Sequence, residues 1–412
     1  SEPDLTVVGT AQSVAQGQLV YSLNHSEISL GLVAFIQQVM MTLLTLVGGS
    51  LADRMERRRL MFVTQGVMMA SGAVLTILAA TGIVQVWHIM ILAGINGAAR
   101  GLNIPTNQTM VGDLVPREIR GSAIALNSAQ FHASRSIGPA LVAVVFVFAT
   151  DSPGAWHGSA ICFGVDALSF GALIWALYIM KFRPDNVEPM GRDLRLELTR
   201  FWHGIREAFL YVRTSPTTGA IIVVTAACAF FGMPLISLMP AYSRDVVIPF
   251  FAHSVSQQVQ GHLLTAAGMG AVIGALGMTT LLRRLPIMRV IMVSAAGYAL
   301  AILAVALTNN EALGWGFMAL TGLCSITYTV LINTQIQTSV PDLIRGRVMA
   351  MYSLAFTLSM AMGNVISGFV ARATSVPIAW TINACGLLLL LLIGMVLRPR
   401  IWWRGHQPTN EA

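Results

Sequence analysis

Long apolar runs alternate with short polar connections along almost the whole chain. Each of twelve runs has at least 19 residues, about the length that a helix needs to cross a bilayer core of roughly 30 Å. We expect these spans at residues 5–23, 29–52, 60–83, 86–113, 121–149, 158–181, 217–243, 258–282, 287–307, 313–338, 346–371 and 377–397. The pattern predicts an all-α membrane protein with about twelve transmembrane helices.

The composition agrees with this prediction. Of the 412 residues, 55% are hydrophobic and only 10% are charged, whereas about 25% of the residues in soluble domains are charged. The four cysteines all fall inside apolar runs, far apart in sequence: Cys162, Cys228, Cys324 and Cys385. This arrangement fits neither a disulfide framework nor a metal-ligand spacing, so we expect no metal and no cofactor.

The positive charges indicate the topology. Alternate connections between the expected spans hold 21 of the 25 lysines and arginines. Because basic residues accumulate in cytoplasmic loops, both termini are predicted to face the cytoplasm. The net charge of +7 therefore reflects topology and does not indicate a nucleic-acid partner.

One short connection between two spans, GGSLADRMERRRL at residues 48–60, has an ordered pattern of glycine, acid and arginines. It resembles the signature loop between helices 2 and 3 of the major facilitator superfamily. The resemblance implies that a clasp of charges closes the cytoplasmic side, with Gly49, Asp53, Arg54, Arg57 and Arg58 at the matching positions. It also implies two six-helix lobes.

A second motif narrows the resemblance. Arg135 is followed by Gly138 and Pro139. This motif is similar to the arginine and Gly-Pro of the exporter branch that includes the enterobactin exporter and macrolide efflux proteins. Gly-Pro is tolerated in a membrane helix where neighbouring groups satisfy the carbonyl that it releases. Leu141 and Val142 replace the last glycines of the longer drug-antiporter motif, a departure from that class.

The two halves repeat. Residues 113–138 resemble residues 339–363 at a shift of 225, and this shift pairs Arg120 with Arg345; we assign both arginines to the cytoplasmic gate. Parallel six-helix repeats are the superfamily arrangement. We expect an N-terminal lobe at 1–181, a cytoplasmic linker with an amphipathic helix at 182–216, and a C-terminal lobe with a short cytoplasmic tail at 217–412.

Ionisable residues inside the expected spans are the main functional candidates, because burying a charge there costs from about 3 to more than 10 kcal/mol. They are Arg100, Arg135 and Asp166. Asp166 could neutralise an arginine in a fixed packing pair, or it could belong to a substrate or proton site. Polar neighbours on the same spans complete the candidate site: Asn103, Asn107, Gln130 and His132.

Two arginines against one aspartate favour an anionic or amphiphilic substrate. We find no catalytic constellation and no phosphate-binding loop, so we expect a secondary transporter and not an enzyme. The resemblance implies a monomeric, proton-coupled exporter of a bulky small molecule, such as a siderophore, in the bilayer of a bacterial inner membrane. Multidrug or macrolide efflux, uptake, lipid flipping and a transport-dead sensor remain alternatives.

Overall fold

The computed structural model describes residues 3–52, 57–114, 145, 156–179, 194–247, 256–280 and 286–397. Within these ranges the regular elements are α-helices, as expected. The span expected at 121–149 lies outside the described residues, apart from one helical position.

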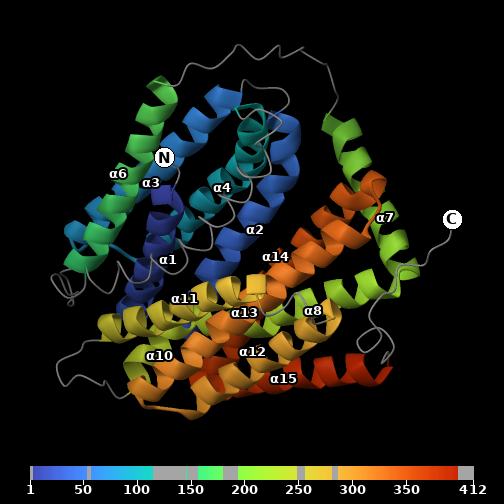
Figure 1. Ribbon diagram of the computed structural model, residues 1–412. Helices are drawn as coiled ribbons and strands as arrows, with labels where there is room; N and C mark the ends of the chain where they lie inside the picture. The colour runs from blue at the N-terminus through green and yellow to red at the C-terminus, as the bar shows by residue number, and fades with distance from the viewer. Residues whose placement is uncertain are drawn as a thin grey trace.

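The helices of the first half lie together in the upper left of Figure 1. They are α1 (Pro3–Asn24), α2 (Glu27–Ala52), α3 (Arg57–Ala80), α4 (Val86–Leu114) and α6 (His157–Ile179). Their ends agree with the predicted spans to within three residues, which is close to the usual uncertainty of a helix boundary.

The helices of the second half lie below them. They include α11 (Ser256–Thr280), α12 (Ile287–Leu307), α13 (Glu311–Ser339), α14 (Asp342–Ala373) and α15 (Val376–Leu397). Between the halves, α7 (Leu194–Thr214) is the predicted amphipathic helix. It packs on α14, where Arg347 pairs with Glu207.

The span expected at 217–243 is present, since Pro216–Ser237 is long and apolar enough to cross a membrane, but it is not one continuous helix. The structure has three helices there: α8 (Pro216–Gly232), α9 (Pro234–Ser237) and α10 (Met239–Asp245). Pro234 and Pro240 cannot donate backbone hydrogen bonds, and this interrupts the helix. Nε1 of Trp380 donates to the Pro234 carbonyl at 3.4 Å, so one carbonyl at the break has a partner.

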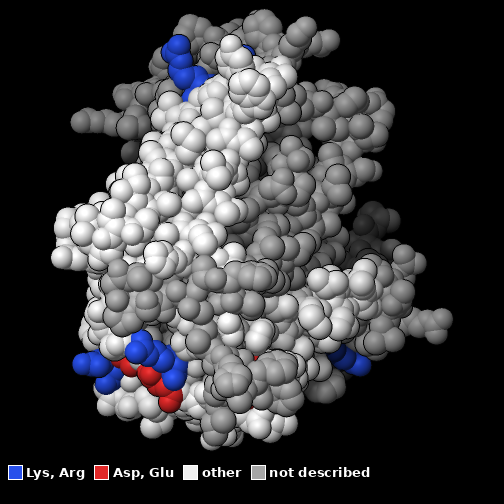
Figure 2. All heavy atoms as spheres, turned by 90° about the vertical axis from the view of Figure 1, so that its left-hand side faces the viewer, with Lys and Arg blue, Asp and Glu red and all other residues white. Residues whose placement is uncertain are grey.

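Nine helices in the described ranges are long and apolar enough to cross a membrane. Large apolar side chains cover their outer surfaces; Leu168 is 75% exposed and Leu397 73%. Figure 2, which faces the left-hand side of Figure 1, shows a mostly uncharged described surface, with a group of basic and acidic atoms at the lower left and further basic atoms at the top and the lower right. Such an apolar surface is suited to lipid.

Glycines bring the same helix pair into close contact in each half. A Cβ on Gly97 of α4 would lie 2.2 Å from the Gln37 carbonyl of α2, and a Cβ on Gly322 of α13 would lie 1.7 Å from the Ala267 carbonyl of α11. Small residues let membrane helices approach this closely. Helix α13 also starts and ends 225 residues after α4, which is the shift of the predicted repeat.

The two groups of helices meet at one end and diverge toward the other (Figure 1). We call these the Tyr21 end, where α1 finishes, and the Arg58 end, where α3 begins. At the Tyr21 end, α2 lies against α14: a Cβ on Gly31 would be 2.6 Å from the Asn364 carbonyl, and one on Gly368 would be 2.8 Å from the Glu27 carbonyl. The lobe boundaries given above remain predictions.

Candidate functional site

Buried polar side chains project from the middle of every described helix in the first half. Each lies at least eight residues from both ends of its helix, or about 12 Å at 1.5 Å per residue. They are Gln16 on α1, Gln38 on α2, Gln65 on α3, Asn96 on α4 and Asp166 on α6, together with the half-buried Arg100 on α4. We call this set the polar interior.

Arg100 and Asn96 form one contact within the polar interior. Nε of Arg100 donates to Oδ1 of Asn96 at 2.8 Å, one helical turn earlier on α4. Oδ1 can accept this bond only while the amide is turned toward the guanidinium, so Asn96 helps to orient Arg100. The bond therefore ties the guanidinium to the middle of the helix.

Asp166 lies on the inward face of α6 and has no exposed surface. Neither of its carboxylate oxygens has a hydrogen-bond partner among the described residues. Arg100 is close enough to interact with it electrostatically, but within the same residues no ion pair joins them. Asp166 and Arg100 are therefore not directly bonded, and a packing pair of Asp166 with Arg135, which lies outside the described residues, stays a prediction.

Unpaired polar atoms also occur on the amides of the polar interior. One amide atom each of Gln16, Gln38, Gln65 and Asn96 is buried without a hydrogen bond in the described part of the chain. Each such group costs about 1–3 kcal/mol when it stays unsatisfied. Several together in one half of the molecule indicate a region where water or a polar ligand supplies the missing bonds.

The other predicted site residues fall into two groups. The structure places Asn103 on α4, where Thr64 Oγ1 lies 3.5 Å from its Oδ1; Asn107 is on the same helix, but its side chain is outside the described part. The predicted residues that lie outside the described ranges altogether are Gln130, His132, Arg135, Gly138 and Pro139. Whether they join the polar interior stays a prediction.

The structure describes only some of the residues assigned to the cytoplasmic gate, and the gate itself stays a prediction. Nη2 of Arg58 donates to the Tyr178 carbonyl of α6 at 3.1 Å, and Nη2 of Arg345 donates to the Val340 carbonyl just before its own helix at 3.2 Å. Both bonds stay within one half. Gly49 and Arg57 belong to α2 and α3 with their side chains undescribed, and Asp53, Arg54 and Arg120 lie outside the described ranges.

Contacts between the halves at the Tyr21 end were missed by sequence reasoning. The Tyr21 hydroxyl donates to Oδ2 of Asp245 on α10, and Nε2 of Gln18 donates to Oγ of Ser256 on α11 at 3.4 Å. Nη1 of Arg372 on α14 also lies 3.9 Å from Oε2 of Glu27. Most of these residues sit near helix ends, where polar side chains are common, so no pattern in the chain signalled a contact across the lobes.

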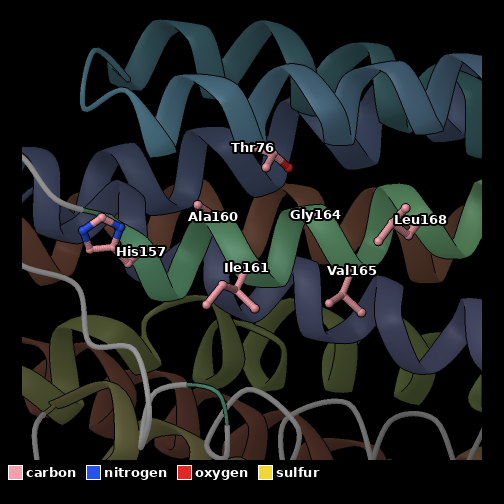
Figure 3. A pocket seen from close by; sticks show the side chains of 7 residues that line it. All are labelled: Thr76, His157, Ala160, Ile161, Gly164, Val165 and Leu168. Carbon is pink, nitrogen blue, oxygen red and sulfur yellow. The ribbon is translucent and has the colours of Figure 1, made fainter.

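A groove along α6 does not belong to this site. It is lined by Thr76 of α3 and by residues of α6 that include Ile161, Val165 and Leu168 (Figure 3). These three side chains are 45%, 47% and 75% exposed, whereas Asp166 on the same helix is fully buried. The groove therefore faces lipid, on the opposite side of α6 from the polar interior.

Curated relatives resemble this chain over most of its length. The staphyloferrin A transporter of Staphylococcus aureus is 22% identical, covering 80% of this chain and 78% of its own. The multidrug efflux pump Tap of Mycolicibacterium fortuitum is 23% identical, covering 94% and 91%. The enterobactin exporter EntS of Citrobacter koseri is 25% identical, covering 92% and 87%. The predicted resemblance to the exporter branch is confirmed.

Solved transporters have the same fold. The nucleoside transporter NupG superposes with a TM-score of 0.69 at 13% identity, covering 96% of this chain and 98% of its own. The xylose transporter XylE from E. coli, in an inward open conformation, gives 0.68 at 14% identity, covering 99% and 96%. The family described as transmembrane secretion effector matches residues 5–410. This chain is a multi-pass membrane transporter and belongs to that family of the major facilitator superfamily.

Proposed function

We propose that this protein is a proton-coupled exporter of a bulky anionic or amphiphilic small molecule, with a siderophore the preferred class. It would act as a monomer in a bacterial inner membrane, with both termini in the cytoplasm. The observation that carries the proposal is a pair of opposite charges in the polar interior: the half-buried Arg100 and Asp166, a fully buried acid without a hydrogen-bond partner among the described residues. Intramembrane ionisable residues of this kind typically mark substrate and proton sites.

Arg100 supplies the part of the site that selects charge. A guanidinium offers several donors in a fixed planar arrangement that matches a carboxylate or a similar oxygen pair. Asn96 orients the guanidinium, and the amides of the polar interior offer further bonds to a ligand rich in oxygen. Two of the relatives are named for siderophores, which supports this substrate class.

Asp166 supplies the exchangeable proton. A carboxyl group buried without hydrogen bonds is more stable protonated, whereas a nearby arginine favours its ionised form. An anionic substrate that binds Arg100 weakens this attraction and favours the protonated acid. Release of the substrate restores the attraction and favours proton release. Substrate and carboxylate thus compete for one positive charge, as coupled transport requires.

The arrangement of the helices supports alternating access between two lobes. The positive-inside bias makes the Arg58 end cytoplasmic, and the helices diverge toward that end (Figure 1). The contacts at the Tyr21 end then form the closed outer side. The chain is therefore interpreted as inward-facing, the state in which an exporter takes up its substrate.

Proteoliposomes with an imposed pH gradient test the proposal. Enterobactin, staphyloferrin A, a macrolide and the cationic dye ethidium are each added, and proton movement is followed with a pH-sensitive dye. We expect that transport of one of the two siderophores is accompanied by proton movement in the opposite direction. Arg100→Gln should abolish this proton movement. Proton exchange with ethidium or the macrolide alone would instead support multidrug or macrolide efflux.

The same vesicles separate the remaining alternatives. Substrate movement in the direction of the protons would indicate uptake, and a response to labelled phospholipid alone would indicate lipid flipping. Binding of a siderophore without any transport would indicate a sensor. Each of these results would overturn export.

A further inference from the structure

One face of α7 packs against the second half. A Cβ on Gly204 would lie 3.5 Å from Cγ of Arg347 on α14, and the Glu207 carboxylate pairs with the same arginine. Ala208 has no exposed surface, and Tyr211 packs against the hydrophobic core. These four positions of α7 are spaced by three or four residues or by one, as expected for a single face of a helix. This packed face of α7 is therefore covered by protein.

The opposite face of α7 is exposed. It consists of Arg206, Phe209, Leu210 and Arg213, which we call the Arg206 face. Each member follows a residue of the packed face by two positions, or about 200° around the helix. Phe209 is 53% exposed and Leu210 52%, and both arginines are exposed as well. The Arg206 face therefore points away from the described part of the protein; α7 lies on the right-hand side of Figure 1.

The charge of the Arg206 face is positive. The neighbouring acid, Glu207, is turned to the other side of the helix, where its carboxylate contacts Arg347 and lies 3.4 Å from Nδ1 of His203. The two arginines of the face are seven residues apart, about 10 Å along the helix, with the two apolar side chains between them. A matching partner must therefore bring negative charge together with apolar surface.

The course of the chain sets the depth of this face in the membrane. Only one residue separates α7 from α8, whose apolar span begins at Pro216. Arg347, which the packed face contacts, is likewise only five residues into α14. Arg213 therefore lies at the surface of the bilayer, at the Arg58 end. Phe209 and Leu210 precede the apolar span by no more than two helical turns.

We propose that the Arg206 face is a binding site for anionic phospholipid in the leaflet at the Arg58 end. Phe209 and Leu210 enter the outer part of the acyl region, as apolar side chains of interfacial helices do. The guanidinium groups of Arg206 and Arg213 bind phosphate groups beside them, because a guanidinium can donate two parallel hydrogen bonds to a phosphate. Each basic side chain close to an anionic membrane surface strengthens the attraction roughly fivefold.

Charge favours lipid over other occupants of this face. The segment 398–412, which follows α15 at the same end, carries three arginines and one glutamate, so it brings positive charge to a positive face. A symmetric pair of chains joined through the Arg206 face would also bring like charges together, because each copy contributes the same patch. Anionic phospholipid supplies phosphate groups next to acyl chains and matches both features of the face.

The site lies on the connection between the two halves. Helix α7 contacts α2 of the first half as well as α14 of the second. Lipid bound to the Arg206 face therefore anchors this connection to the bilayer, on a different helix from the polar interior. The inference goes beyond the proposed export and requires neither its substrate nor its protons.

A spin label at Thr214→Cys tests whether this face lies in lipid. Thr214 is exposed and one helical turn beyond Leu210, and the exposed Cys385 is changed to serine. The full-length protein is placed in nanodiscs of phosphatidylcholine, with or without an equal amount of phosphatidylglycerol. Access of oxygen and of a neutral water-soluble nickel complex to the label is then measured. We expect phosphatidylglycerol to raise access of oxygen and to lower access of the nickel complex.

Native mass spectrometry measures the lipid preference directly. The full-length protein in detergent is titrated with phosphatidylglycerol or phosphatidylcholine that has the same acyl chains. We expect tighter binding of phosphatidylglycerol, and a preference about tenfold or more smaller in the double variant Arg206→Gln and Arg213→Gln. Arg206→Lys with Arg213→Lys keeps both charges and should retain most of the preference. Arg59→Gln, which removes an exposed arginine at the same end, is the matched control and should also retain it.

Each other result overturns the inference. Equal binding of the two lipids by the parent, or a preference that survives the double glutamine variant, excludes this site, as does an equal loss in Arg59→Gln. A label shielded from both reagents in every lipid would show that protein covers the face, either a second copy or residues 398–412. A label that stays open to the nickel complex would show that the face is in water.

Thermal unfolding checks that the double glutamine variant keeps its fold, and since both arginines are exposed, we expect the same midpoint as the parent. No measurement here involves substrate or a pH gradient. Failure of the proposed export therefore leaves the lipid site intact, and loss of lipid preference leaves the proposed export to be judged by transport alone.

Discussion

The hydroxyl of Tyr21 on α1 donates a hydrogen bond to the Asp245 carboxylate at the end of α10, and this bond joins the two halves of the molecule. A hydrogen bond to a charged group contributes about 1.5–3 kcal/mol. Under the proposed alternating access, this bond would form only in the state that is closed at the Tyr21 end. Its energy would therefore bias the equilibrium between the two proposed states.

Tyr21→Phe should consequently shift the population toward the state that is open at this end. We expect about a tenfold or larger change in the ratio of the two states, because 1.4 kcal/mol corresponds to a factor of ten. Spin-label distances across the Tyr21 end measure the ratio. Tyr178→Phe, a change at an exposed tyrosine of α6, should have no effect. An unchanged ratio in Tyr21→Phe would show that the bond does not hold the end closed.

The glycine contact between α11 and α13 gives a prediction about stability. Gly322→Ala would place a methyl group 1.7 Å from the Ala267 carbonyl, so the helices must separate. Overpacking of this kind typically costs about 1–3 kcal/mol, and we expect a lower thermal midpoint in detergent. Gly316→Ala on the same helix meets nothing within 4 Å and should be neutral or slightly stabilising, because alanine favours a helix over glycine. Equal midpoints for the two variants would contradict the close contact.

Hydrophobic length predicted the helices well. Eleven of the twelve expected spans fall on described helices, because a run of apolar residues must be helical to satisfy its backbone in lipid. The same rule could not place the break at Pro234, since membrane helices also tolerate proline within a continuous span. Hydropathy averages over such a site and therefore does not locate the break.

The candidate site was predicted less completely. Charges within spans are conspicuous, so Arg100 and Asp166 stood out in the sequence. The buried glutamines did not, because a single amide in an apolar run can equally face the bilayer interface. Glu311 was missed for another reason: it directly follows a polar turn at Asn309 and Asn310 and so resembles an ordinary first residue of a helix. One of its contacts is with His262, which is 49 residues away, so no local pattern in the chain could indicate its burial.

Substitution of Arg100 tests the preference for anionic substrates. Arg100→Gln removes the charge, and we expect binding of the transported siderophore to weaken by about 10- to 100-fold, the equivalent of one charge-assisted hydrogen bond. Arg100→Lys keeps the charge without the planar donors and should weaken binding less. Titration of the purified protein measures both affinities. Arg59→Gln, at an exposed arginine of the Arg58 end, is the control, and an equal loss in that variant would mean that charge acts only at long range.

Asp166→Asn separates a proton site from a structural one. Both carboxylate oxygens are buried without a hydrogen bond in the described part of the protein, so neutralising them removes no direct bond. Asparagine has nearly the same shape as the protonated acid. We therefore expect Asp166→Asn to be at least as stable as the parent, to bind substrate, and to exchange substrate across the membrane without a pH gradient. Accumulation driven by the gradient should be lost.

A structural ion pair predicts the opposite result for the same variant. If Asp166 mainly neutralised Arg100, its removal would leave a buried arginine uncompensated, at a cost of about 3–5 kcal/mol, and the protein would be unstable and poorly expressed. Thermal unfolding and gradient-driven accumulation, measured on one preparation of Asp166→Asn, decide between the two roles. A stable variant that still accumulates substrate with the gradient would contradict both, and the coupling proton would then have to bind elsewhere.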